Sequence, residues 1–246
     1  MNYTNEQIQE LDVASKSVYY FASLCLPDIY KQQLHLLDTY MDEQNCLSLV
    51  SRQCGNTTIE ACYALWVMIF KHEKRIGYNS TCLTSATHFI QIIVKLNEKL
   101  PEYMRASFSN TQGNKIQNEL TKSVILTNAY NSTCYRGLTL HLLILDCFHF
   151  ISENNFKKFY SHLYPCLVAC NTQVIMSSSI NVKGFKLYDI FKCSVLEDFN
   201  INVIPYYMCS GYSQKAIENI KNYLSIDALY KSAYLCIDGE GNNYVK

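Results

Sequence analysis

Residues 51–58 have the side chains and the position of a phosphate-binding loop, with one exception. They follow an apolar stretch at 46–50 that predicts a strand, and they precede a long apolar stretch at 59–70 that predicts a buried helix. A loop at such a junction directs backbone N–H groups to one point, where the helix dipole also favours an anion. Thr57 stands where such loops carry the hydroxyl for Mg²⁺, but the preceding lysine that holds the outer phosphates is replaced by Asn56.

Two further polar groups follow predicted strands. The apolar run at 142–146 ends in Asp146, as expected of a strand buried on both faces. The strand predicted at 173–176 is followed by three serines, Ser177, Ser178 and Ser179. In nucleotide-hydrolysing domains, the phosphate loop, an acid that orients Mg²⁺ and a polar sensor meet at the carboxyl ends of adjacent strands. The order and spacing of these groups are those of a Walker-type ATPase.

These groups need a sheet to position them. Strands are predicted at 46–50, 75–79, 124–126, 142–146, 173–176 and 201–209, with a hairpin within 107–121. Helices are predicted at 5–20, 30–42, 59–70, 85–99, 156–169 and 213–224, with a further helical stretch from 186 to 192. Strands that alternate with helices predict an α/β fold, a mostly parallel sheet flanked by helices on both faces.

Composition narrows the function classes. Lys+Arg and Asp+Glu both number 21 in the 246 residues, so no overall basic field indicates nucleic-acid binding. There is no apolar run of about 18 residues, so no membrane-spanning helix is expected. The chain has 12 cysteines but no export signal, so we expect reduced thiols. His162, Cys166 and Cys170 have helical spacing, and apolar packing is favoured there over metal binding.

Taken together, the motifs resemble the ATPase domain of the large terminase subunit, the DNA-packaging motor of tailed phages and herpesviruses. That family's loop reads Ser-Arg-Gln-x-Gly-Lys-Thr-Thr, and residues 51–58 match it except at Asn56. Gln33, with Gln32 as the neighbouring candidate, resembles the family's adenine-binding glutamine. The resemblance covers about residues 28–246. It also includes an Arg-Gly element at 135–137, a coupling motif at Ser177–Ser179 with Asn181, the segment at 184–189, and 233–235 near Gly239.

The resemblance implies the fold of a RecA-like P-loop NTPase and a role for each matching residue. Mg²⁺ and ATP are the implied cofactors, with Thr57 and Asp146 as the metal ligands. Asp146, Arg52 and Arg136 are the implied catalytic residues, and Ser177, Ser178 and Ser179 are the implied coupling residues. The implied nucleotide-binding residues are Gln33, Ser51, Arg52, Gln53, Gly55, Asn56, Thr57 and Thr58.

The family also implies partners and a domain layout. Double-stranded DNA, the portal, the small terminase subunit and a nuclease-bearing subunit are the implied partners, with a possible ring of subunits in the cytoplasm of an infected host cell. No membrane partner is expected. We expect a helical segment at 1–45 packed on a P-loop ATPase-like domain at 46–246. The family's nuclease domain would begin where this sequence stops, so no nuclease domain is expected.

Two departures from the family pattern bear on activity. Asn56 brings no positive charge to the phosphates, and Cys147 stands where the family has the glutamate that polarises water. A thiol is mostly protonated at neutral pH and replaces a carboxylate poorly. Arg52 is either a substitute cation or a solvated loop residue. Arg136 either orients the site or reaches a neighbouring subunit, or it forms a structural ion pair.

Three hypotheses follow. The leading one is a terminase-type domain that is deficient in hydrolysis and binds a nucleotide, DNA or a motor partner. The second is an active packaging ATPase whose nuclease lies on another chain, with Arg52 and an acid such as Glu153 replacing the lost groups. The third is a structural interaction protein built on an inactive phosphate loop.

Overall fold

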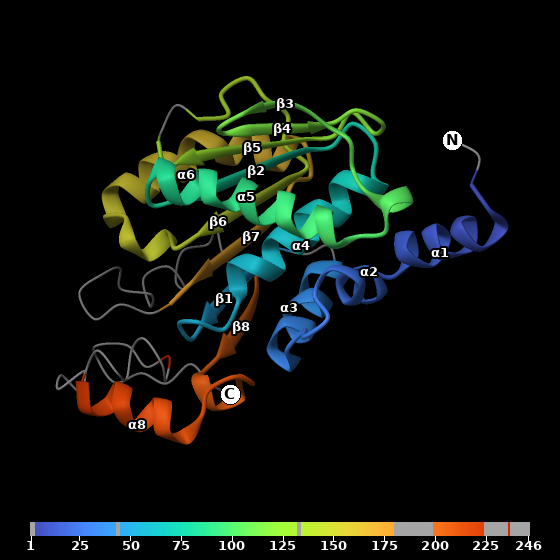
Figure 1. The fold of residues 1–246 in the computed structure, drawn as a ribbon. Helices are drawn as coiled ribbons and strands as arrows, with labels where there is room; N and C mark the ends of the chain where they lie inside the picture. The colour runs from blue at the N-terminus through green and yellow to red at the C-terminus, as the bar shows by residue number, and fades with distance from the viewer. Residues whose placement is uncertain (1–2, 43–44, 132–133, 180–198, 224–235, 237–246) are drawn as a thin grey trace.

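The chain forms one mixed sheet of eight strands. The computed structural model describes residues 3–42, 45–131, 134–179, 199–223 and 236. Within them the strands lie in the order β3-β4-β5-β2-β6-β7-β1-β8 (Figure 1). The six strands from β5 to β8 in this order are parallel, and the β3-β4 hairpin extends the edge next to β5 in antiparallel pairing. The predicted α/β fold with a mostly parallel sheet is confirmed.

The elements follow one another along the chain with short connections. The strands are β1 (Asn45–Val50), β2 (Arg75–Ser80), β3 (Phe108–Gln112), β4 (Lys115–Asn118), β5 (Val124–Ala129), β6 (Leu142–Asp146), β7 (Gln173–Ser178) and β8 (Phe199–Ile204). The α-helices are α1 (Asn5–Lys16), α2 (Val18–Cys25), α3 (Lys31–Met41), α4 (Asn56–Phe70), α5 (Leu83–Lys99), α6 (Glu153–Ala169) and α8 (Gln214–Tyr223). Three short 3₁₀ helices are η1 (Glu102–Met104), η2 (Phe148–Phe150) and η4 (Tyr206–Met208).

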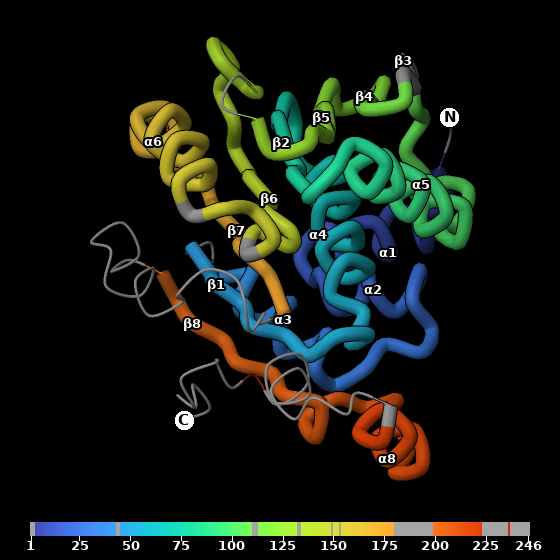
Figure 2. The backbone as a smooth tube through the Cα atoms, turned by 90° about the vertical axis from the view of Figure 1, so that its left-hand side faces the viewer, coloured from blue at the N-terminus to red at the C-terminus, as the bar shows by residue number. Residues whose placement is uncertain are grey.

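The central strands are covered on both faces. All five residues of β6 are buried, and their side chains alternate between two apolar clusters. Leu142 and Ile144 belong to the cluster that includes α4 and α5. Leu143 and Leu145 belong to the cluster that includes α6. Figure 2 shows α6 on one side of the sheet and α4 and α5 on the other. Because each face is covered by helices, the strand read as a continuous apolar run in the sequence.

Helices α1, α2 and α3 form an outer layer against α4. Phe21, Leu36 and Tyr40 are fully buried in the same cluster as α4. The indole N–H of Trp66 donates to the carbonyl of Ala14 over 2.9 Å, which fastens α1 to the middle of α4. The division of the chain at residue 45 stays a prediction.

Three sequence predictions were wrong in their boundaries. The single helix predicted at 5–20 is two helices, because Ser17 is extended and its side chain accepts from the Tyr20 N–H to begin α2. The strand predicted at 201–209 ends at Ile204, since Pro205 has no N–H to continue the ladder and a 3₁₀ turn follows. Ser177 and Ser178 belong to β7 and do not follow it.

Some predictions lie outside the described residues: the helical stretch at 186–192, Asn181, the segments at 184–189 and 233–235, and Gly239. Among the helices that the structure does describe, none combines the length and apolar character needed to cross a bilayer.

Candidate phosphate-loop site

The loop between β1 and α4 has the backbone geometry of an anion site. Its first residue, Ser51, donates its N–H to the carbonyl of Ile204 over 2.8 Å, which ties the loop to β8. Gly55 precedes α4 with φ of +74°, a left-handed conformation that glycine adopts without strain. The N-cap residue of α4, Gly55, has no side chain to bond the first-turn N–H groups, and N–H groups that the cap does not satisfy are suited to bind an anion.

The predicted residues meet in one cavity. A cavity of about 420 Å³ lies over the loop at the carboxyl ends of β6 and β7. Its walls include most of the residues that the sequence nominated for nucleotide and metal binding. They are Ser51, Arg52, Gln53, Gly55, Asn56, Thr57, Thr58, Asp146, Cys147, Ser178 and Ser179.

Asp146 is the centre of the polar network in this cavity. It is 6% exposed, and its Oδ2 accepts from the Thr57 hydroxyl over 3.1 Å and from the Tyr78 hydroxyl over 2.8 Å. The Ser177 hydroxyl lies 3.4 Å from Oδ1, since Asp146 and Ser177 are partners in the β6-β7 register. A carboxylate beside a threonine hydroxyl offers the oxygen ligands that Mg²⁺ prefers, so Thr57 and Asp146 fit the metal. The sequence did not indicate Tyr78 as a partner of Asp146, because a tyrosine in a predicted strand is expected to lie in the apolar core.

Cys147 cannot replace a catalytic carboxylate. It directly follows β6 with φ of +56°, and the Tyr130 hydroxyl donates to the carbonyl of Asp146 next to it. Burial raises the pKa of the Cys147 thiol strongly, the neighbouring Asp146 carboxylate raises it further, and Arg52 opposes the rise. A thiol with a raised pKa stays protonated at neutral pH, and it cannot accept a proton from an attacking water.

Asn56 is engaged within the protein. Its Nδ2 donates to Oε1 of Glu60, one turn later in α4, over 2.9 Å. Glu60 is fully buried, and its Oε2 has no hydrogen-bond partner among the described residues. The sequence analysis missed Glu60; the signal was the one charged residue in the apolar stretch 59–70, four positions after Asn56. The Asn56 amide, which was expected to donate to a phosphate, therefore donates to Glu60 inside the protein.

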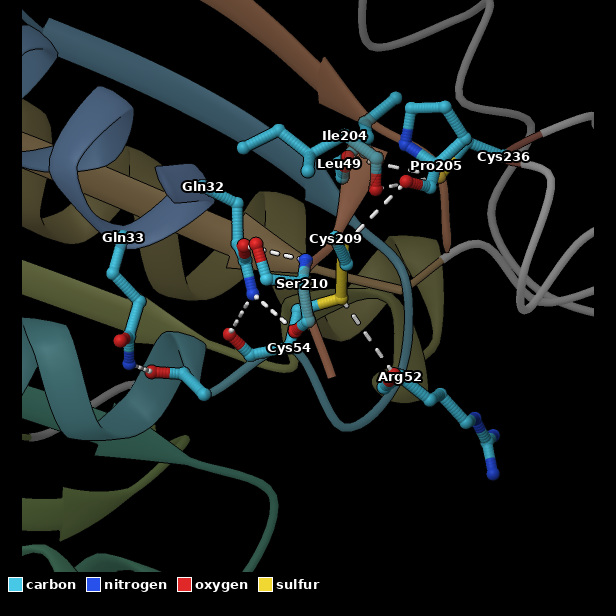
Figure 3. The surroundings of a disulfide bond; sticks show 11 residues. Gln32, Gln33, Leu49, Arg52, Cys54, Ile204, Pro205, Cys209, Ser210 and Cys236 are labelled. Carbon is cyan, nitrogen blue, oxygen red and sulfur yellow. Dashed lines mark hydrogen bonds between the residues drawn. A yellow bond between two sulfur atoms is a disulfide. The ribbon is translucent and has the colours of Figure 1, made fainter. Parts of the chain in front are cut away.

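Of the two candidate arginines, Arg52 lines the cavity and Arg136 does not. The side chain of Arg52 extends away from the loop's disulfide in Figure 3, and its guanidinium carbon lies 6.0 Å from the centre of the Phe150 ring. Arg136 is exposed in the connection between β5 and β6 and does not line the cavity. The residues present thus fit Mg²⁺ better than they fit the charge of a triphosphate.

Both candidate adenine-binding glutamines hold the loop in place. The Gln33 amide donates to the carbonyl of Gly55 over 3.0 Å, and its Oε1 accepts from the Tyr30 N–H. Gln32 accepts from the Ser210 N–H over 3.0 Å and donates toward the carbonyls of Ser210 and Cys54 (Figure 3). Their amides are therefore occupied by backbone groups of the loop, of the residue before α3 and of the segment after η4.

A disulfide corrects the prediction that all thiols are reduced. Cys54, in the middle of the phosphate loop, is bonded to Cys209, which follows η4 (Figure 3). The two residues are 155 positions apart, so sequence spacing could not pair them. They meet because β8 pairs with β1 in parallel, so that the segment after β8 lies beside the phosphate loop that follows β1.

With this geometry established, comparison with solved structures identifies the fold. The large terminase of bacteriophage HK97 aligns with a TM-score of 0.71 at 14% identity, over 90% of this chain and 54% of that chain. The ATPase domain of the Thermus phage P74-26 large terminase aligns with a TM-score of 0.66 at 13% identity, over 89% and 96%. A large terminase of a thermophilic bacteriophage, in complex with ADP, aligns with a TM-score of 0.66 at 11% identity, over 84% and 53%.

The chain therefore has the fold of a phage large terminase ATPase domain, as the motif resemblance implied. It spans about half the length of the HK97 terminase and of the ADP-bound terminase. No family model and no curated protein matches the sequence.

Proposed function

We propose that this chain is a terminase-type ATPase-like domain that serves viral DNA packaging without efficient ATP hydrolysis. It acts as a module that binds a nucleotide, DNA or another component of a packaging motor. The fold supports the packaging context, and the chemistry of the loop supports the loss of turnover.

One observation carries the loss of turnover: the residue next to Asp146 is Cys147, a cysteine whose thiol pKa is raised by burial and by Asp146. In phosphoryl transfer, the attacking water has to be oriented and relieved of a proton, and a nearby carboxylate is the usual group for this. Cys147 is kept neutral by burial and by Asp146.

The test is steady-state hydrolysis of Mg²⁺-ATP by the purified chain, alone and with double-stranded DNA. We expect no turnover above that of Asp146→Ala, which removes the metal-binding carboxylate. Rapid Mg²⁺-dependent hydrolysis by the original chain, abolished in Asp146→Ala, would contradict the proposal.

The contact between Thr57 and Asp146 favours one alternative, an active motor subunit. This contact preserves the metal-binding half of a hydrolytic site. An active enzyme would also require Arg52 to turn toward the phosphates and an acid such as Glu153 to approach from the start of α6. If Asn56→Lys combined with Cys147→Glu leaves turnover of an assembled ring unchanged, the original site was already complete.

The partners and location follow from the same proposal. Double-stranded DNA, a portal, a small terminase subunit and a nuclease-bearing subunit are the candidates, in the cytoplasm of an infected host cell. If the chain binds neither nucleotide nor DNA but retains a packaging protein in a pull-down, the structural interaction hypothesis is favoured.

A further inference from the structure

We propose that Glu60, acting with Asn56, determines that this phosphate loop lacks affinity for polyphosphates. The Glu60 carboxyl withdraws the residue-56 side chain from the loop and compensates any positive charge placed there. The inference rests on the proposed function and deepens it, since among the three candidate ligands it disfavours the nucleotide and leaves DNA or another motor component.

The geometry places Glu60 directly beneath the loop. Asn56 is the first residue of α4 and lines the cavity, whereas Glu60 lies one turn deeper and is fully buried. The 2.9 Å bond from Asn56 Nδ2 to Glu60 Oε1 joins the two side chains. Glu60 Oε2 and Asn56 Oδ1 are both buried without a hydrogen-bond partner among the described residues. The pair is thus connected internally and incompletely satisfied, and a buried acceptor without a donor is destabilising.

The surroundings of Glu60 contain acids and weak acids rather than a cation. Asp146 of β6, Tyr40 of α3 and Cys46 of β1 interact electrostatically with its carboxyl. Burial raises the pKa of Glu60 well above its ordinary value and Asp146 raises it further, while Ser177 and Asn56 lower it. A carboxyl in this setting loses its proton most readily when a cation comes within reach.

This setting explains why a lysine at residue 56 would not suffice. An ammonium group at that position lies within reach of the Glu60 carboxyl, which would ionise and form a buried pair with it. A paired ammonium contributes little net charge to a phosphate in the cavity. Polyphosphate affinity therefore requires two changes together: a cation at residue 56 and an uncharged side chain at residue 60.

The experiment measures binding of inorganic tripolyphosphate and of Mg²⁺-ATP by calorimetry. The set comprises the original chain, Asn56→Lys, Glu60→Gln and the double variant Asn56→Lys/Glu60→Gln. Glutamine keeps the length and the acceptor oxygen of residue 60 but cannot ionise beside a lysine at residue 56. Asn56→Lys/Glu98→Gln is the matched control, since Glu98 is an exposed carboxyl on α5. If the glutamine variant does not fold, Asn56→Lys/Glu60→Met removes the charge with a side chain of similar length.

We expect each single variant to bind tripolyphosphate within about threefold of the original chain. In Asn56→Lys the buried pair compensates the new charge, and Glu60→Gln adds no cation to the loop. The double variant should bind about 10- to 100-fold more tightly, the gain expected of one charge-assisted hydrogen bond. The Glu98 control should behave like Asn56→Lys.

The role of Glu60 would be overturned by full affinity in Asn56→Lys alone, or by a double variant no better than Asn56→Lys. Tight binding by the original chain would overturn it as well. The proposed function is judged separately, by ATP turnover of the original chain, so either conclusion can fail while the other stands.

Discussion

The hydroxyl of Thr57 at the start of α4 donates to Oδ2 of Asp146 at the end of β6, across 89 positions of sequence and 3.1 Å of space. The same oxygen accepts from the Tyr78 hydroxyl over 2.8 Å. Asp146 therefore stabilises the junction of three segments as well as offering a metal ligand, and the two roles can be separated by experiment.

Asp146→Ala should lower the free energy of unfolding by about 1–3 kcal/mol, because the buried hydroxyl of Tyr78 loses its acceptor. Urea denaturation measures the change. The control is Asp38→Ala, which removes an exposed carboxylate from α3 and should have little effect. Equal stability of the two variants would show that Asp146 has no structural role.

The disulfide predicts a redox-dependent stability. Cys209→Ser should lower the free energy of unfolding by about 2–4 kcal/mol under non-reducing conditions, since the bond to Cys54 closes a long loop. With a reducing agent the two proteins should unfold at similar urea concentrations. Cys166→Ser, which removes an exposed unpaired thiol, serves as the control. Mass spectrometry of the unreduced chain that finds Cys54 and Cys209 as separate thiols would refute the pairing.

The thiols of Cys82 and Cys147 should differ in reactivity and in pH dependence. Hydrogen bonds from Ser85 lower the pKa of the exposed Cys82, whereas burial and Asp146 raise that of Cys147. Only the thiolate is alkylated, so Cys82 should react faster at neutral pH and approach its maximal rate at a lower pH. Peptide mapping after timed iodoacetamide treatment between pH 6 and 9 gives both profiles. Equal rates at the two positions would contradict the raised pKa of the half-buried Cys147.

The two glutamines before the loop should act on stability and not on base preference. Gln32→Ala removes an amide that the Ser210 backbone both donates to and accepts from, and should lower the free energy of unfolding by about 1–3 kcal/mol. Any ratio of ATP to GTP affinity should remain as in the original chain. Gln91→Ala, which alters an exposed amide on α5, is the control. A changed ratio in Gln32→Ala would mean that this amide leaves the backbone to contact the base.

The parallel strands were predictable because their burial on both faces produces uninterrupted apolar runs, as at 142–146. The points where a helix or strand is interrupted were harder to locate. Ser17 interrupts a helical pattern that continues on both sides of it, and its role as a cap depends on an extended backbone that composition does not show. At Pro205 the sequence does mark the end of β8, because proline has no N–H for the ladder. The apolar residues continue beyond it, and they extended the predicted strand to residue 209.

The sequence by itself determined the α/β class, the phosphate loop at 51–58 and the acid at the end of β6, because local periodicity and the order of motifs carry that information. Only the tertiary structure decided which partners the side chains in and around the phosphate loop bind. Asn56 turns to Glu60, Gln32 is bound by the Ser210 backbone, and Cys54 meets Cys209 across 155 positions. The Asn56–Glu60 bond is local to α4, but the sequence does not show which way the Asn56 side chain turns. The other two contacts depend on β8 pairing with β1 next to α3, and long-range proximity of this kind leaves no periodic trace in a single sequence.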